Sequence, residues 1–356
     1  MLSLFKKQAK GYIGMELATS QLRMVELSGT KDKPVLERYA IVEIPTEMYS
    51  NNEVHDQLTL GKLIKDTFAK GFSNKRIALA MPSSQVITKE FNIPESASPD
   101  EQMEIVQTEV QNTVPLDLDE IYIDYKVLPT SKEEGTFEAA FAVSKKEHVD
   151  DRVGALEIAG LEAKIVDSEH NAMMYSVDAV LYQQLQIEEE ENVLVVHTTK
   201  EKTEYMVFRS SRLIWVRDTN LSAKTLFDAI SLSYGVDANE AQAMAFNPDN
   251  YTEAYERLKV DTIQPFIDSI SLEINKHIEM FNESGVSFSI QRILISGELA
   301  AVAEIDETIN AQNNIETHTI NALAHCELGS KIDMQKLIED VSLLTIAMGM
   351  ALRTFE

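Results

Sequence analysis

The histidines and the cysteine form no recognisable metal or nucleophile site. The seven histidines are scattered, and none belongs to an HExxH, HxH or Cys-His pattern. Cys326 is the only cysteine, so it can form neither an intramolecular disulfide nor, alone, a thiolate-rich zinc site. The GxSxG, Walker A and GxGxxG motifs are also absent. Hydrolase and Rossmann functions therefore receive no support.

Three single residues with chemical potential have structural explanations. Asp124 is out of phase with the apolar residues of its strand, so we expect it on the solvent-facing side. Trp215 lies mid-strand among alternating apolar residues, which favours core packing over ligand stacking. His277 falls on the polar face of a helix, so we expect it to be exposed and to bind no metal. None of the three indicates a catalytic residue.

Acidic residues far outnumber basic ones. The 58 Asp and Glu against 32 Lys and Arg give a formal net charge of -26. This charge repels phosphate backbones and anionic lipids, so we expect no nucleic-acid partner. The longest apolar stretch near the carboxyl end, 343–352, is shorter than the roughly 18 residues that cross a bilayer. We expect a soluble, cytoplasmic protein.

The amino terminus differs from the acidic remainder of the chain. It reads MLSLFKKQAKG and has no long apolar region behind its charges, so it is not a signal peptide. The alternatives are a frayed tail and a short basic amphipathic patch that makes an auxiliary contact with the membrane or a membrane-near protein. The patch would consist of Leu2, Leu4, Phe5, Lys6, Lys7 and Lys10.

The same order of strands and helices occurs in both halves of the chain. The first half has strand patterns at 12–17, 22–28 and 35–44, a helix pattern at 60–68 and a strand at 76–82. The second half has strands at 192–199, 203–208 and 212–217, helices from 222 and over 263–281, and a strand at 289–297. Each half ends with one more strand and helix, at 162–181 and at 315–353. Two such units predict an α/β fold of two ribonuclease-H-like lobes.

The first copy contains an insertion that the second lacks, at 83–160. It has its own strands and helices, including one that starts with a capping box at Ser144 and Glu147. We therefore expect an inserted α+β subdomain. The predicted domains are 1–82 with 161–186 as the first lobe, 83–160 as the subdomain, 187–340 as the second lobe, and 341–356 as a C-terminal helix packed back on the core.

Six segments in register carry a resemblance to a known family. They are YIGMELATSQLRMVELS, VQNTVPLDLDEIYIDYKVLP, AGLEAKIVDSEHNAM, YGVDANEAQAM, RILISGELAAVAEI and LTIAMGMALR. In this order they resemble the actin-like proteins of the PilM and FtsA group, and most closely the PilM family of type IV pilus assembly. The resemblance implies two actin-like lobes (1A and 2A/2B) with an FtsA-type 1C insertion. It also implies ATP and Mg²⁺ held between two phosphate hairpins and a glycine-rich adenine turn.

The positions that the resemblance assigns to nucleotide depart from the family pattern. In the first hairpin Asp-x-Gly becomes Glu16-Leu17-Ala18, and Arg23 stands in place of a Lys. In the second hairpin Asp-x-Gly becomes His197-Thr198-Thr199. The adenine turn keeps Gly297 but has Glu298 where a second Gly is expected. Added β-carbons obstruct close backbone approach, and Glu298 repels an anionic ligand.

Other family positions retain some chemical potential. Thr19, Ser20 and Thr203 keep hydroxyls in the two hairpins. Glu273 and Lys276 match positions near the adenosine, although an exposed i,i+3 pair explains them at least as well. We assign no catalytic residue and no metal site. ATP and Mg²⁺ are the implied cofactors, but the substitutions favour weak or absent binding and hydrolysis.

The resemblance implies a scaffold rather than an enzyme. It implies that a groove between the first lobe and the insertion binds the cytoplasmic N-terminus of the membrane protein PilN, at the inner face of the inner membrane, and couples it to pilus motor ATPases. The expected contacts, which a subdomain core explains equally well, are Val86, Ile87, Phe91, Ile93 and Met103. The alternative is an ATP-binding actin-like ATPase with nucleotide-regulated partner binding. A filament-forming, FtsA-like protein is a third reading, disfavoured because the sequence stops at Glu356 directly after the core helix.

Overall fold

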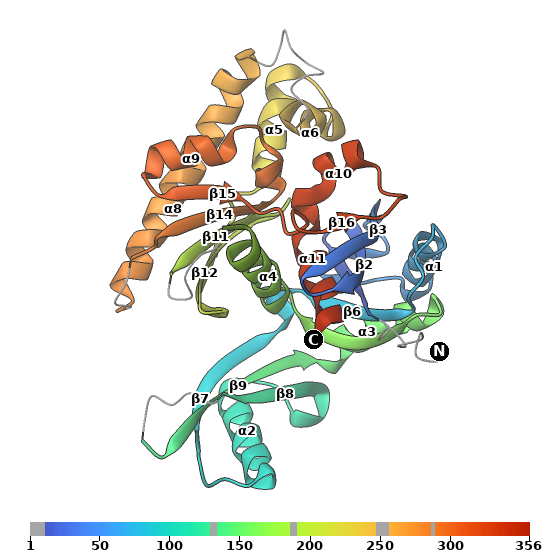
Figure 1. Cartoon of the computed structure of the whole chain (residues 1–356), viewed down its shortest axis with the longest axis vertical. Helices are drawn as coiled ribbons and strands as arrows, with labels where there is room; N and C mark the ends of the chain where they lie inside the picture. The colour runs from blue at the N-terminus through green and yellow to red at the C-terminus, as the bar shows by residue number, and fades with distance from the viewer. Residues whose placement is uncertain (1–10, 129–133, 186–190, 247–255, 286–288) are drawn as a thin grey trace, which may run out of the picture. The chain divides into compact units, whose positions relative to one another are not determined.

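The computed structural model describes residues 11–128, 134–185, 191–246, 256–285 and 289–356 (Figure 1). The basic N-terminal patch lies outside these ranges. Among the described residues, no helix combines the length and the apolar character needed to cross a bilayer.

Two sheets repeat one strand order. The larger sheet has the order β10 (Glu162–Ser168), β6 (Arg76–Met81), β1 (Ile13–Ala18), β2 (Gln21–Thr30), β3 (Lys33–Glu43) and β16 (Glu327–Leu328). The smaller has the order β13 (Arg212–Thr219), β12 (Thr203–Arg209), β11 (Val193–Thr198), β14 (Arg292–Gly297) and β15 (Glu316–Thr319). In both, the third, second, first, fourth and fifth strands of a unit lie side by side. The duplication that the sequence predicted is confirmed.

The helices alternate with these strands. They are α1 (Gln57–Phe68), α3 (Lys146–Ile158), α4 (Glu169–Asp178), α5 (Ala223–Tyr234), α6 (Ala238–Phe246), α8 (Gln264–Glu283), α9 (Ile305–Asn313), α10 (Met334–Asp340) and α11 (Thr345–Leu352). The longest, α8, buries Ile267, Ile270 and Ile274 at the three- and four-residue steps of an amphipathic helix. These side chains belong to the same buried cluster as Leu194 and Val196 of β11.

The central strand β11 explains where polar groups of the second half gather. Every residue of β11 is buried, and the strand runs antiparallel to β12 and parallel to β14. Parallel neighbours end at the same edge of a sheet, and here Thr198 at the end of β11 pairs with Gly297 at the end of β14. The last residues of β11 and β14 therefore lie together.

The insertion forms a sheet of its own. Its strands are ordered β7 (Ile87–Pro94), β9 (Thr136–Lys145), β8 (Ile121–Leu128), and α2 (Pro99–Thr113) contributes Val106 and Val110 to their core. A capping box joins Ser98 and Glu101 at the start of α2. The short strands β4 (Tyr49–Ser50) and β5 (Glu53–Val54) form a separate hairpin.

The capping box predicted at Ser144 is wrong. Ser144 is still part of β9, where it pairs with Tyr122 of β8, and the N-cap of α3 is Lys145 without a side-chain hydrogen bond. The strand ladder therefore prevails over the local capping signal. Helix α3 packs closely on α1. A β-carbon added at Gly61 of α1 would lie only 2.6 Å from the Ile158 side chain of α3.

The chain divides into two compact units. The first comprises residues up to Gly14, Arg23–Ile41 and His170–Glu356, and the second comprises Met15–Leu22 and Val42–Glu169. The boundary passes through β1, β2 and β3. The domain limits predicted from the sequence remain a prediction. Within the first unit, α11 packs directly on α4, since a β-carbon at Gly349 would lie 1.8 Å from the carbonyl oxygen of Ala172.

Candidate functional site

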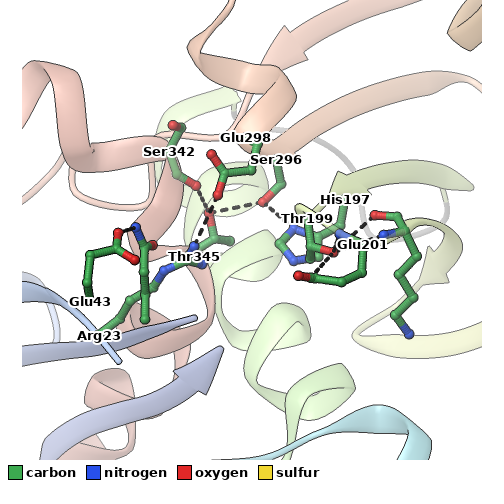
Figure 2. Close-up of polar contacts among 11 residues, drawn as sticks. Arg23, Glu43, His197, Thr199, Glu201, Ser296, Glu298, Ser342 and Thr345 are labelled. Atoms are coloured by element: carbon green, nitrogen blue, oxygen red, sulfur yellow. Dashed lines mark hydrogen bonds and ion pairs between the residues drawn. The ribbon is translucent and has the colours of Figure 1, made fainter. Parts of the chain in front are cut away.

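His197 and Ser296 connect the ends of two parallel strands in the first unit. They pair in the β11–β14 register, and the His197 Nδ1 lies 3.1 Å from the Ser296 Oγ. Figure 2 shows Ser296 between His197 and Thr345. The Ser296 hydroxyl donates to the Thr345 Oγ1 at 3.0 Å, and Thr345 donates to the Ser342 carbonyl at 3.1 Å. Because the Ser296 proton is used in this chain, the His197 Nδ1–H must donate to Ser296.

Burial keeps the His197 ring neutral. The side chain is 5% exposed. Burial lowers the pKa of His197 to about 4, although the nearby Glu204 carboxylate opposes this shift. At neutral pH the ring is therefore uncharged and hydrogen-bonded, and it cannot supply the negative charge of a metal-binding carboxylate.

The backbone conformation and the close neighbours at position 297 require a glycine there. Its φ of +75° lies in a region that side chains rarely adopt. A β-carbon there would lie 2.2 Å from the Thr198 carbonyl oxygen and 3.1 Å from the His197 ring. Strand β11 thus fills the space beside the glycine.

Two of the substituted positions form a buried ion pair. Glu298, which is 2% exposed, begins a short turn of 3-10 helix over Glu298–Ala301. The Arg23 Nη2 lies 3.5 Å from the Glu298 Oε1, and Arg23 is itself 5% exposed. In the sequence, Arg23 and Glu298 were recognised only as two separate substitutions. Their opposite charges were the signal that could have linked them.

The turn of the second hairpin satisfies its own backbone donors. The Thr199 Oγ1 accepts hydrogen bonds from the amides of Glu201 and Lys202, each at 3.2 Å (Figure 2). Consecutive amides that converge in this way form the kind of concavity that binds an anion in phosphate loops. Here a threonine hydroxyl of the same turn occupies that position.

Thr203 is also bonded internally. It is fully buried, and its hydroxyl donates to the Leu221 carbonyl at 2.6 Å while lying 3.0 Å from the Thr198 Oγ1. With its proton used in this way, the hydroxyl is not directed to a ligand.

A buried glutamate that was not predicted from the sequence lies opposite His197. Glu204 pairs with His197 across β11 and β12, and its Oε1 lies 2.9 Å from the Lys202 Nζ and 3.5 Å from the His170 Nε2. Burial favours the neutral acid, but the hydrogen bond from His170 and the charge of Lys202 outweigh it and lower the pKa of Glu204. The signal available in the sequence was a glutamate within the strand pattern TEYMVF.

The first hairpin lies in the second unit, apart from Arg23. Glu16 is buried, whereas Ala18, Thr19 and Ser20 are partly exposed. The Ser20 carbonyl accepts a hydrogen bond from the Ile44 amide at 2.8 Å. In the described part of the chain, the hydroxyls of Thr19 and Ser20 have no hydrogen bond comparable to that of Thr199.

The helix α8 carries the two residues assigned to adenosine. The Lys276 Nζ lies 3.1 Å from Glu273, and the Lys276 side chain is 57% exposed. The two residues therefore form the i,i+3 pair that the sequence offered as the alternative to adenosine binding. The expectation that His277 is exposed is wrong, because the residue is 3% exposed and its ring centroid lies 4.0 Å from that of Tyr205. Aromatic neighbours on β12 and β13 cover a helix face that appeared polar in the sequence.

The residues expected to bind a peptide separate into two groups. Ile93 is fully buried, and Phe91 packs on Phe141 with ring centroids 5.9 Å apart. Val86 is partly exposed. Ile87 and Met103, in contrast, are 41% and 40% exposed. Only these last two offer a large apolar surface.

Two further expectations are confirmed. Asp124 is exposed on β8, and Trp215 packs edge-on against His277 and Phe281. Within the described residues, no group of three His, Cys, Asp or Glu side chains could hold a metal ion.

The sequence matches the model of a known protein family, and the structure is similar to solved structures. The sequence model of the family described as type IV pilus assembly protein PilM matches residues 14–355. The structure is similar to a chain of a PilM–PilN type IV pilus biogenesis complex, with 22% identity, 98% of this chain and 99% of that chain covered, and a TM-score of 0.79. It is also similar to the ethanolamine utilization protein EutJ from Carboxydothermus hydrogenoformans, with 12% identity, coverage of 96% and 89%, and a TM-score of 0.54.

At these identities the similar structures show a shared fold, which is the duplicated actin-like α/β fold that the sequence predicted. The family match extends over nearly the whole sequence. This chain therefore belongs to the PilM family of type IV pilus assembly proteins.

Proposed function

We propose that this chain is a scaffold of the type IV pilus assembly machine that binds the N-terminal peptide of a PilN partner and couples it to motor ATPases at the inner face of the inner membrane. The carrying observation is the family match over residues 14–355. The similarity to a chain from a PilM–PilN complex, over 98% of this chain, supports the choice of partner.

The inserted subdomain supplies the peptide contacts in this proposal. Ile87 and Met103 are the exposed apolar side chains of the predicted set, so they are the anchors for apolar side chains of the peptide. Phe91 packs on the core of the subdomain and Ile93 is fully buried, so both support the fold rather than contact the peptide. Val86 directly precedes β7, next to Ile87.

The scaffold works without nucleotide in this proposal. Three features support this part: the turn amides held by Thr199, the space beside Gly297 filled by His197, and Glu298 buried against Arg23. A phosphate of ATP would have to displace the first, and the adenosine would meet a carboxylate at the third. These residues do not fit the nucleotide that the fold family implies, so we derive no catalytic step.

Calorimetric titration with a synthetic peptide of the cognate PilN N-terminus tests the proposal. We expect equal affinity with and without Mg-ATP. Ile87→Asp and Met103→Asp should each weaken binding by more than about tenfold, because each places a charge in an apolar contact. Leu232→Asp on α5 is the matched control, since Leu232 is 89% exposed in the other unit and should leave affinity unchanged.

A second candidate is an ATP-binding actin-like ATPase whose partner binding depends on nucleotide. The first hairpin favours it, because Glu16, Thr19 and Ser20 keep a carboxylate and two hydroxyls. Titration with Mg-ATP, followed by calorimetry and Trp215 fluorescence, separates the two candidates. Tight saturable binding, or peptide binding only with ATP, would replace the scaffold proposal with this one.

A further inference from the structure

A pocket of about 440 Å³ lies in the inserted subdomain, between the end of β7 and one face of α2. Figure 1 shows these two elements near each other in the lower part of the view. Its volume falls in the range of roughly 300–1,000 Å³ that is typical of ligand sites. All of the lining residues belong to the second unit.

The pocket combines apolar and acidic side chains. Pro94, Ala97 and Ile105 supply the apolar lining, and Glu101, Glu104 and Glu109 supply carboxylates. On α2, residues 101, 105 and 108 follow one helical face at steps of four and three. The pocket is therefore a groove beside one stripe of this helix.

The three carboxylates of the pocket differ in whether they have hydrogen-bond or ion-pair partners within the protein. Glu101 accepts hydrogen bonds from the Ser98 amide and hydroxyl, both at 2.8 Å, and Glu109 lies 3.1 Å from the Lys89 Nζ. In the described part of the chain, Glu104 has no such side-chain partner. It also follows Asp100 and Glu101 by four and three residues, and α2 has no Lys or Arg to balance them. Asp100 and Glu101 lie in the first turn of α2, where carboxylates are favourable, so Glu104 is the carboxylate that a cation in the groove would pair with.

We propose that this groove binds a basic segment of a partner protein, with a lysine or arginine beside an apolar residue. The alkyl stem packs on Ile105 and Pro94, and the cationic head reaches Glu101 and Glu104. The same carboxylates repel nucleic acid and anionic lipid. Charge complementarity thus selects a cationic peptide as the occupant.

This site goes beyond the peptide contacts proposed above. Ile87 and Pro94 are the two ends of β7, roughly 23 Å apart for an extended strand. Met103 projects from α2 about 160–200° away from Glu101 and Ile105, at 100° per residue. A basic segment in the groove therefore leaves the two apolar anchors uncovered.

Fluorescence anisotropy with the full-length protein tests the proposal, using a fluorescein-labelled peptide GLRRLG and its uncharged counterpart GLQQLG. We expect saturable binding of the first and none of the second. Glu104→Lys should weaken binding by about tenfold, because it removes one attraction and adds a repulsion. Thr108→Trp should weaken it comparably by filling the groove without changing its charge.

The control is Glu157→Lys on α3, an exposed glutamate in the same unit that changes the net charge equally. Equal weakening by Glu104→Lys and Glu157→Lys would overturn the proposal in favour of a general charge effect, and so would equal binding of the two probes. Each variant is also titrated with the PilN peptide. Retained PilN binding shows that the variant is folded, and it separates failure of this groove from failure of the scaffold proposal.

Discussion

The hairpin between β1 and β2 and the equivalent hairpin between β11 and β12 differ in how their polar groups are hydrogen-bonded. The first presents partly exposed Thr19 and Ser20 after a buried glutamate. In the second, His197 is neutral and bonded to Ser296, and the Thr199 hydroxyl holds two amides of the turn. Equivalent positions in a duplicated fold have thus reached different chemical states.

The difference shows that the polar groups of a hairpin can find their hydrogen-bond partners within the same unit. Buried donors and acceptors need partners, and an unpaired one costs about 1–3 kcal/mol. In the second hairpin each substitution supplies such a partner within the same unit. Arg23 and Glu298 follow the same logic with charges, since each would be costly if buried alone.

Breaking the Arg23–Glu298 pair should have the largest effect. Arg23→Met leaves the Glu298 carboxylate buried without its cation, and we expect a loss of about 3–5 kcal/mol in the free energy of unfolding. The double variant Arg23→Met with Glu298→Gln should regain more than half, because it removes both charges. Urea denaturation measures both. A loss below about 1 kcal/mol in the single variant would show that the pair does not compensate.

Gly297→Ala should be next. Its β-carbon meets the Thr198 carbonyl at 2.2 Å and the backbone has a φ of +75°, so we expect a loss of about 3 kcal/mol from strain and overpacking together. Gly235→Ala is the matched control, because φ is +67° there but nothing lies within 4 Å of the added carbon. It should lose only about 1 kcal/mol. Equal losses would mean that close packing of β11 against Gly297 is unimportant.

Acid should weaken the fold through His197. Its pKa is about 4 when folded and 6.5 ordinarily, so between these values the unfolded chain binds more protons and stability falls as pH falls. From pH 7 to pH 5 we expect this residue to account for a loss of about 2 kcal/mol. Denaturation of His197→Gln at both pH values should show a pH dependence smaller by that amount. An unchanged dependence would mean that the ring is not held neutral by burial.

The smallest effect compares the hairpins directly. Thr199→Val removes the acceptor of two turn amides, and we expect a loss of about 1 kcal/mol. Thr19→Val should lose less than about 0.5 kcal/mol, because its hydroxyl has no such role among the described residues. Thermal and urea unfolding of the pair measure the difference. If Thr19→Val costs as much as Thr199→Val, the contrast between the hairpins fails.

Local patterns were sufficient for much of the fold. The strand runs at 12–44 and 192–217, each followed by helices and a parallel strand, predicted the repeated sheet because side-chain periodicity reports the type of element. Capping at Ser144 was wrong, since a ladder to β8 holds that residue extended. The predicted exposure of His277 was wrong for a related reason, because aromatic residues distant in sequence bury its side chain.

The candidate site was only partly visible in the sequence. Glu16, Arg23, His197 and Glu298 were recognised as substitutions at family positions. Ser296, which bonds to His197, and Thr345, which bonds to Ser296, were not recognised, because nothing in their own neighbourhoods marks them. A partner on another strand becomes apparent only when the sheet register is known.

By itself, the sequence determined the duplicated α/β architecture, the inserted subdomain and the acidic character of the chain, because these depend on periodicity, order and composition. The tertiary structure alone decided which substituted residues stabilise each other. Arg23 and Glu298 are 275 residues apart, and only the folded arrangement of β2 and the end of β14 makes them one ion pair. Burial and pairing are long-range properties, so the charge or hydrogen-bonding state of a residue follows from neighbours that its local sequence does not specify.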